Sequence, residues 1–314
     1  MTPELLKYLC DPLDKGNLSI RNPVIGPDGS IASGVLLSAS GRFYPIRNGI
    51  PRFVDEKGRT DSVRSFGDEW NYFNFDQFKL NWLNHAVKNT FGGLAAFSGK
   101  LVVDWGAGSG IQSRWMVEAG ARHVIALELS HSVDGVMQRN LRGVSNVDIV
   151  QCSIDAPPIK DACVDGIVLC HNVIQHTLSV EATAKALWRL VAPGGEFVFN
   201  CYGKNDLGLL RKMRLDLYRA VRTVRSRAPF RVILWYSRIM AVLRFVPRLG
   251  YLLEKSLLMV RGDVPAGPDR WRRAYICGVH NTFDCYGSHS YQHLRPMMRS
   301  GPSSQTYSPI RLRF

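Results

Sequence analysis

The first residues with a spacing suited to chemistry follow an apolar run in the middle of the chain. Leu101-Val-Val-Asp104 leads into Trp-Gly106-Ala107-Gly108-Ser-Gly110, which places three glycines at alternate positions behind an acid. Glycine permits positive φ and a close approach of the backbone to a ligand. A helix that begins after such a turn presents free N–H groups to that ligand. The pattern therefore predicts a strand, a ligand-binding turn and a helix. It departs from the dinucleotide fingerprint G-x-G-x-x-G in the place of its third glycine.

A second acid lies at the end of the next strand-like run. Glu128 closes His-Val-Ile-Ala-Leu-Glu, 24 positions after Asp104, and Leu129 follows it. In nucleotide-binding sheets of parallel strands, an acid at this place accepts hydrogen bonds from the ribose hydroxyls. We therefore expect Glu128 and Leu129 to line the site of a cofactor that contains a nucleoside.

Strands and helices alternate over residues 99–201, in an order that would bring these groups together. Five short runs are rich in β-branched and apolar residues, as strands buried on both faces are: LVVDW, HVIAL, VDIVQ, DGIVLC and GEFVFN. Segments with helical spacing lie between them, and the last of these ends in Pro-Gly-Gly, a helix stop signal. The alternation predicts an α/β fold with a Rossmann-like, doubly wound, mostly parallel sheet.

Four motifs within this range together resemble those of class I S-adenosylmethionine-dependent methyltransferases. The glycine turn resembles the first motif of that family, and Leu-Trp-Arg-Leu-Val-Ala-Pro-Gly-Gly resembles its L-x-R-x-L-K-P-G-G turn. The resemblance implies S-adenosylmethionine as cofactor. An acid in the turn suits a cofactor with a cationic amino group and no pyrophosphate. The residues expected around its methionine part are Asp104, Gly106, Ala107, Gly108 and Gly110.

The segment that follows the third strand resembles another motif of the family, with departures. Ser153 stands where an Asp usually contacts the adenine amino group, and a hydroxyl can still accept a hydrogen bond from that group. Ile154 stands at the position that holds the adenine ring. Cys170 and His171 fall at the carboxyl end of the fourth strand, where ligands bind in such sheets. We count Ser153, Ile154 and Cys170 among the cofactor-binding residues.

Two histidines of this segment are candidates for a general base. His176 matches the second His of the family's V-L-H-H, and Gln175 replaces the first. A histidine is poised for proton abstraction near neutral pH. We therefore assign the catalytic role to His176 first and to His171 second. The alternative for both is a structural histidine that bonds a loop carbonyl.

Two segments of different character precede the predicted sheet. Residues 1–55 resemble, in their ending Gly-Arg-Phe-Tyr-Pro-Ile-Arg-Asn-Gly-Ile-Pro-Arg, the small zinc-ribbon-like module before many bacterial methyltransferases. The C-P-x-C of metal-binding relatives reads Cys10-Asp-Pro-Leu here, so we expect a degenerate module without metal. Residues 56–98 are expected to form a helical connector. Its aromatic residues either dock it onto the next domain or make it a lid, with Trp70 or Phe66 touching the cofactor.

The last third of the chain carries the net charge of +14. Beyond residue 201 there are 21 Lys and Arg against six Asp and Glu, whereas the first 201 residues are close to neutral. Residues 202–260 are predicted to form a basic helical cap, with helices over 207–226 and 230–258 and a break near Pro247. Residues 261–314 are expected to be an irregular tail, truncated or frameshifted, because no strand–helix–strand pattern follows the fifth strand.

Composition sets the expectations for compartment and partners. Seven cysteines without a C-x-x-C pair indicate reduced, mostly buried thiols, a cytoplasmic location and no metal site. No run reaches the roughly 18 apolar residues of a membrane-spanning helix, and the acidic, proline-containing start is unlike a secretory signal. The basic residues 207–258 predict an anionic partner, and contact with an anionic membrane surface would place the protein at the membrane periphery.

Three functions fit these observations. The leading one is in-line methyl transfer to a small-molecule acceptor, anionic or lipid-linked. An RNA methyltransferase is less favoured, because Cys170-His-Asn-Val stands where base-methylating enzymes carry Asn/Asp-Pro-Pro-Tyr/Phe; RNA binding that weakens steeply with salt would support it. The third is a non-catalytic, S-adenosylmethionine-binding scaffold. The oligomeric state, the acceptor and the methylated atom stay open.

Overall fold

The structure is a computed structural model of the 314-residue chain. It describes residues 1–54, 61–200, 228–256, 258–260, 268–286 and 310–314, together with positions 213, 216, 220, 222 and 264. The chain divides into two compact units. The first comprises Met1–Arg59, Ala86–Cys201 and Tyr307–Phe314, and the second comprises Thr60–His85 and Tyr202–Thr306. The predicted connector is thus shared between the two units.

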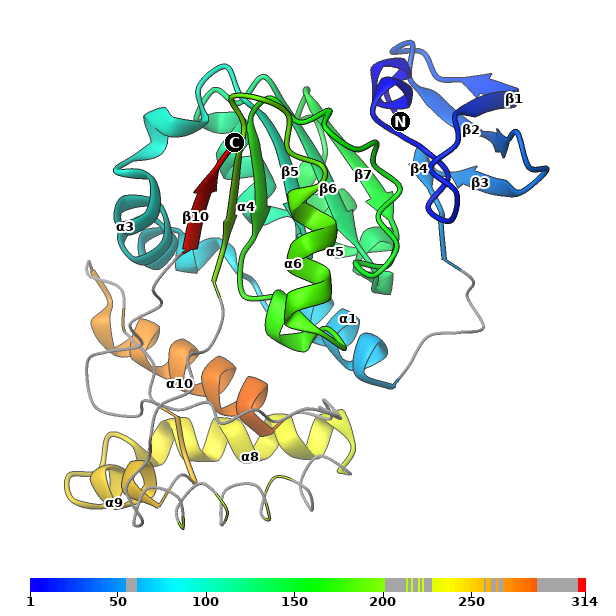
Figure 1. Ribbon diagram of the computed structural model, residues 1–314. Helices are drawn as coiled ribbons and strands as arrows, with labels where there is room; N and C mark the ends of the chain where they lie inside the picture. Colours follow the sequence, from blue (N-terminus) through cyan, green and yellow to red (C-terminus); the bar gives the residue numbers. More distant parts are fainter. Residues whose placement is uncertain are drawn as a thin grey trace. The chain divides into compact units, whose positions relative to one another are not determined.

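A six-stranded sheet forms the centre of the first unit (Figure 1). Its order is β10-β9-β8-β5-β6-β7, and all neighbours are parallel except β10 and β9. The strand order reverses between β5 and β8, which is where ligands bind in doubly wound sheets. This confirms the predicted α/β class and Rossmann-like sheet. The strands are β5 (Leu101–Trp105), β6 (His123–Glu128), β7 (Val147–Gln151), β8 (Ile167–Cys170), β9 (Glu196–Phe199) and β10 (Ile310–Arg313).

Short helices connect the parallel strands. Ser179 caps α6, because its hydroxyl oxygen accepts a hydrogen bond from the Ala182 N–H at 3.2 Å. The segment after β6 forms two short helices rather than one, because Gly135 separates them. The helices of this unit are α3 (Lys88–Phe91), η5 (Leu94–Phe97), α4 (Ile111–Glu118), η6 (His131–Asp134), α5 (Val136–Leu141), η7 (Ile174–His176) and α6 (Val180–Trp188).

The N-terminal segment folds as a β-rich module, in agreement with its strand-like runs. It is an antiparallel sheet of order β1-β2-β3-β4 that follows a short helix, η1 (Pro3–Lys7). Among the described residues, no three His, Cys, Asp or Glu side chains lie close enough to hold a metal ion. The likeness to a zinc ribbon stays a prediction. The strands are β1 (Leu18–Ile25), β2 (Ile31–Ser38), β3 (Phe43–Arg47) and β4 (Ile50–Pro51).

This module is joined by hydrogen bonds to the loop that follows β7. The Cys10 N–H donates to the Pro158 carbonyl at 3.0 Å, and the Lys160 N–H donates to the Tyr8 carbonyl at 2.9 Å. The Lys15 ammonium donates to the Pro157 carbonyl at 2.7 Å. The loop held in this way carries Ser153 and Ile154.

The second unit is helical. The predicted break in the basic helix is confirmed, because α8 ends at Leu243 and α9 begins at Leu249. The predicted helix over 207–226 lies outside the described residues, apart from four isolated positions. No helix in the described part of the chain has the length and hydropathy needed to cross a bilayer. The helices are α1 (Asp61–Tyr72), η3 (Asp76–Phe78), α2 (Lys79–Asn81), η4 (Trp82–Val87, reaching into the first unit), α8 (Phe230–Leu243), α9 (Leu249–Lys255) and α10 (Arg270–Tyr286).

The expectation of an irregular tail from residue 261 needs correction where the structure describes it. Helix α10 spans 17 residues, and its Val279 and Phe283 pack in one cluster with residues of α8. Packing overrides the poor helix propensity of its Gly, Thr and Cys residues. Strand β10 reads as polar, but its Arg311 guanidinium donates to both carboxylate oxygens of Glu196 at 2.7 and 2.8 Å. The frameshift hypothesis stays a prediction.

His280 of α10 lies among aromatic rings and beside a buried carboxylate. Its Nε2 is 3.2 Å from Glu69 Oε1. Desolvation lowers the pKa of His280, but the interaction with the nearby Glu69 carboxylate, together with the charge of Asp284, outweighs this and raises the pKa above its ordinary value. The rings that surround it at 5.1 to 5.2 Å are Phe73, Phe75 and Phe78.

We expect this ion pair to make stability depend on pH. Because the folded state binds the His280 proton more tightly than the unfolded chain, the stabilisation is complete below about pH 6.5 and disappears as the pH rises through the folded pKa. Thermal unfolding followed by circular dichroism from pH 5.5 to 9 measures this. His280→Gln should remove the dependence, whereas His131→Gln in the other unit should retain it. An unchanged slope in His280→Gln would contradict the assignment.

Candidate functional site

The glycine turn lies at the carboxyl end of the central strand β5. The N–H groups of Gly106 and Ala107 both donate to the Leu127 carbonyl, at 2.8 and 3.0 Å, which ties the turn to β6. The φ angles of Gly106, Gly108 and Gly110 are +70°, +57° and +72°. The backbone is therefore left-handed at every second residue, which explains the alternate glycines in the sequence.

Glu128, at the end of β6, accepts hydrogen bonds from two backbone N–H groups. Its Oε2 accepts from Gly108 and its Oε1 from Ser130, each at 2.8 Å. The side chain is buried. A carboxylate has about four acceptor positions, so two stay available for the hydroxyls of a ligand. The predicted acid is thus part of the glycine turn as well as a candidate ligand group.

Asp104 is buried beneath the turn, and Ser113 of α4 holds it. The Ser113 hydroxyl donates to Asp104 Oδ2 at 2.6 Å. Burial raises the pKa of Asp104 to about 6, and the charge of Glu128 adds to the effect while the Ser113 hydrogen bond opposes it. Sequence analysis missed Ser113. A hydroxyl in the first turn of the helix after a glycine turn is the signal that could have found it.

The end of β8 supplies a neutral thiol and a neutral imidazole. Burial raises the pKa of Cys170 far above its ordinary value, so the group stays a thiol. Burial also lowers the pKa of His171 to about 4. Within the described part of the chain, neither His171 Nδ1 nor the buried Trp105 Nε1 has a hydrogen-bond partner. Two buried polar atoms near the ends of β8 and β5 thus have unused hydrogen-bonding capacity among the described residues.

The remaining predicted residues lie on the loops after the strands. His176 ends η7 and is exposed, and its Nε2 lies 3.3 Å from Gln175 Nε2. Ser153 accepts a hydrogen bond from the Asp155 N–H at 3.3 Å, in a local turn. Ile154 is partly buried against the main core. The Leu129 carbonyl accepts from Gln151 Nε2 at 3.1 Å.

A network around Arg52 braces the same edge of the sheet, and sequence analysis missed it. Arg52 Nη1 donates to Gln151 Oε1 at 2.8 Å, and Nη2 donates to Asp134 Oδ1 at 2.5 Å. Gln151 Nε2 also donates to the Ser130 carbonyl at 3.2 Å. Asp134 and Gln151 lie 82 and 99 positions after Arg52 in the chain. No local sequence pattern therefore predicts the network.

Comparison with known proteins identifies the part of the chain that carries these groups. Residues 103–199 match a family model described as a methyltransferase domain. They include the glycine turn, Glu128 and the end of β8. This part of the chain is similar to methyltransferase domains. The matched residues begin within β5 and end at the last residue of β9, so the matched part contains the whole parallel part of the sheet apart from the first two residues of β5.

Two relatives that match this part of the chain are named ubiquinone biosynthesis O-methyltransferases. A ubiquinone biosynthesis O-methyltransferase of Aromatoleum aromaticum is 34% identical over 128 residues, which are 40% of this chain and 51% of that protein. A protein of the same name from Acinetobacter baumannii is 28% identical over 134 residues, 42% of this chain and 53% of that one. The chain thus spans about half the length of the curated relatives it matches.

The solved structures that match are distant. An S-adenosylmethionine-dependent methyltransferase from Mesorhizobium loti is 24% identical, with a TM-score of 0.32, over 38% of this chain and 55% of that chain.

S-adenosylmethionine is the cofactor of class I methyltransferase domains, and the residues at this edge of the sheet fit it. The turn presents two buried carboxylates, which would repel a pyrophosphate but suit a cationic ligand. Glu128 has acceptor positions left for ribose hydroxyls. The unpartnered Trp105 Nε1 and His171 Nδ1, noted above for the described residues, add polar atoms at the same edge. This donor and acceptor set matches an amino acid joined to a nucleoside.

Proposed function

We propose that this protein is an S-adenosylmethionine-dependent methyltransferase that methylates a hydroxyl group of a small-molecule acceptor. The observation that carries the proposal is the pair of buried carboxylates at the carboxyl ends of β5 and β6: Asp104, and Glu128, which accepts a hydrogen bond from the Gly108 N–H of the glycine turn. When bound, S-adenosylmethionine supplies a sulfonium methyl group that an acceptor oxygen attacks in line. The relatives are named O-methyltransferases, which supports a hydroxyl acceptor.

The chain's own residues hold and orient the reactants in this proposal. Asp104 and the glycine turn hold the methionine part, and Glu128 accepts from the ribose hydroxyls. Leu129, Ser153 and Ile154 line the adenine side. Cys170 contributes a thiol that burial keeps protonated, so it does not compete with the acceptor as a nucleophile. Fixing the reactants in this way is the main source of rate enhancement in such a transfer.

His171 and His176 are the proposed general bases for the acceptor proton. His171 stays neutral above about pH 4, so a rate that depends on it should fall only near pH 4. We expect His171→Asn or His176→Asn, whichever removes the base, to lower kcat by about hundredfold while S-adenosylmethionine still binds. Labelled methyl transfer to a panel of phenols, anionic and lipid-linked ones first, measures this from pH 4 to 9. If both variants transferred the methyl group as fast as the unsubstituted protein, neither histidine would be the general base.

Asp104 makes the affinity for the cofactor depend on pH. Its raised pKa means that the carboxyl loses its charge as the pH falls through about 6, and a neutral carboxyl attracts a cationic amino group less. Calorimetric titration with S-adenosylmethionine between pH 5 and 8 should show weaker binding at the acid end. In Asp104→Asn the affinity should be low throughout and independent of pH. A constant affinity of the unsubstituted protein would contradict this role.

One titration tests the proposed function as a whole. S-adenosylmethionine should bind in the micromolar range, with NAD as a negative control, and a phenol in the panel should accept the labelled methyl group. Cofactor binding without transfer to any acceptor would leave the scaffold alternative. Absence of binding to the folded protein would refute the proposal.

A further inference from the structure

Helix α8 has two apolar faces, and only one of them packs against other described residues. Ile233, Leu234 and Ala241 are buried in one cluster with Val279 and Phe283 of α10. A second set of large apolar side chains is 52 to 62% exposed. At 3.6 residues per turn its members fall within about 80° of one another, opposite the buried face. They are Val232, Trp235, Ile239 and Val242.

We call this exposed set the outer stripe. Its spacing, with steps of three and four residues along α8, is that of one helix face. Scattered exposed apolar side chains are normal, but a row of large apolar side chains along one helix face marks an interaction site. The outer stripe consists of Val232, Trp235, Ile239 and Val242, and three more exposed apolar side chains follow it in the turn and in α9: Val246, Leu249 and Leu252.

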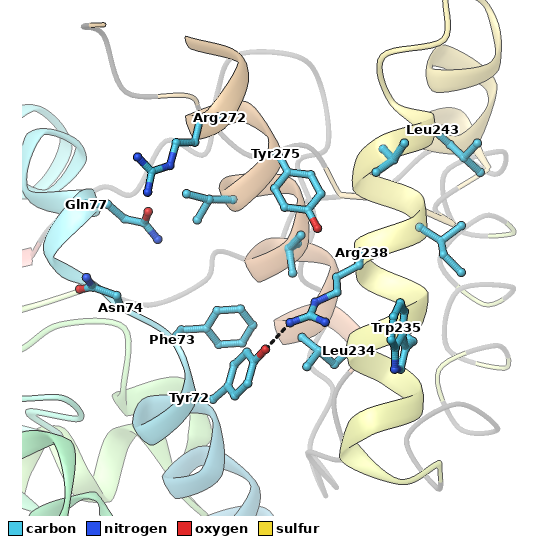
Figure 2. A pocket seen from close by; sticks show the side chains of 14 residues that line it. Tyr72, Phe73, Asn74, Gln77, Leu234, Trp235, Arg238, Leu243, Arg272 and Tyr275 are labelled. Atoms are coloured by element: carbon cyan, nitrogen blue, oxygen red, sulfur yellow. Dashed lines mark hydrogen bonds between the residues drawn. The ribbon is translucent and has the colours of Figure 1, made fainter. Parts of the chain in front are cut away.

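A groove of about 730 Å³ in the same unit adjoins the outer stripe (Figure 2). Trp235 and Ile239 line it from α8, and Arg272 and Tyr275 line it from α10. Arg238 donates to the Tyr72 hydroxyl at 2.6 Å, and its guanidinium lies 5.5 Å from the Trp235 ring. No acidic side chain is among the described residues that line the groove.

The charge of this region decides which partner fits. Over residues 228–256 and 258–260 there are four arginines and one lysine but a single acid, Glu254. Arg270, Arg272 and Arg273 begin α10. A second copy of the chain docked on this face would place its own arginines against these arginines, and the repulsion between positive charges is unfavourable. An anionic surface with an apolar interior complements both the arginines and the outer stripe.

We propose that the outer stripe and its flanking arginines bind the surface of a bilayer that contains anionic lipids. Trp235, Ile239 and Val242 enter the boundary between headgroups and acyl chains, and the arginines contact the headgroup phosphates. The helix lies in the plane of the surface in this arrangement. The proposal is independent of methyl transfer, because its residues all belong to the helical unit.

Vesicle sedimentation of the full chain tests the proposal. The protein should pellet with vesicles of phosphatidylcholine and phosphatidylglycerol and much less with phosphatidylcholine alone. Trp235→Ser with Ile239→Ser should weaken binding by about tenfold or more. Arg231→Gln should weaken it by about fivefold at low salt. Phe43→Ser replaces a still more exposed apolar residue in the other unit. This variant is the matched control and should bind as before.

Three results would overturn the proposal. The first is an unsubstituted protein that stays in the supernatant, and the second is a double variant that pellets unchanged. The third is a concentration-dependent dimer in light scattering that the double variant abolishes, since the face would then bind a second copy. Unchanged thermal unfolding of the double variant confirms its fold. Its titration with S-adenosylmethionine is read separately, so that failure of cofactor binding and failure of membrane binding are distinguished.

Discussion

Glu128→Gln should abolish most of the affinity for S-adenosylmethionine. In the structure both carboxylate oxygens accept backbone N–H groups, from Gly108 and Ser130. An amide replaces one acceptor by a donor that faces an N–H, and it also loses the charge offered to the ribose hydroxyls. Two hydrogen bonds from the ribose hydroxyls to a charged carboxylate contribute about 3 kcal/mol together. We therefore expect the affinity for S-adenosylmethionine, measured by calorimetry, to fall about a hundredfold.

Glu118→Gln is the matched control for this substitution. Glu118 is an exposed carboxylate on α4 that pairs with Arg114 at 2.9 Å. Its replacement should change the affinity by less than about twofold, because exposed ion pairs contribute little. If Glu128→Gln bound the cofactor as tightly as Glu118→Gln, the proposed ribose contact would be wrong. Circular dichroism of both variants separates loss of binding from loss of fold.

Gly106→Ala should both destabilise the first unit and prevent cofactor binding. The backbone at φ +70° is strained for a residue with a Cβ atom, and here that atom would overlap the Val173 side chain. The positive φ costs about 1 to 2 kcal/mol and the overlap about as much again. We therefore expect a loss of about 3 kcal/mol in the free energy of unfolding, measured with urea. Because Val173 lies between His171 and His176, its displacement disturbs both proposed bases.

Gly41→Ala separates the two contributions. Gly41 has a φ of +82°, and a Cβ there would meet nothing within 4 Å. It should cost only about 1 kcal/mol and leave cofactor binding intact. Val173→Ala in the Gly106→Ala background should restore part of the lost stability. Equal losses at the two glycines would show that strain, and not the contact with Val173, determines the effect.

The parallel sheet was predictable because its strands are short, apolar runs interrupted by glycine turns. Asp104, Glu128 and the alternate glycines were predictable as a group for the same reason, since the carboxyl ends of neighbouring parallel strands meet at one edge. These are local signals, and each is contained in about ten residues. They predict the fold class, and they bring the residues expected to bind the cofactor to one edge of the sheet.

The rest depended on contacts between distant parts of the chain. Arg52 reaches Gln151 across 99 positions, and neither residue is unusual in its own segment. Helix α10 has weak propensity and forms because α8 covers one of its faces. Strand β10 alternates apolar residues with arginines, and only its pairing with β9 and Glu196 makes it a strand. The burial of individual side chains could not be predicted from the sequence either. It is burial that raises the pKa of Asp104 and lowers the pKa of His171.

The placement of β10 has a consequence for synthesis on the ribosome. Arg311 contacts Glu196 across 115 residues, so β9 lacks its partner β10 until residues 310–313 have emerged. During this interval β9 presents unpaired N–H and C=O groups, which can template pairing with a neighbouring nascent chain. Once β10 is in place, the arginines at 311 and 313 make the new edge charged and resistant to further pairing. The pairing of β10 with β9 thus protects this edge of the sheet from aggregation.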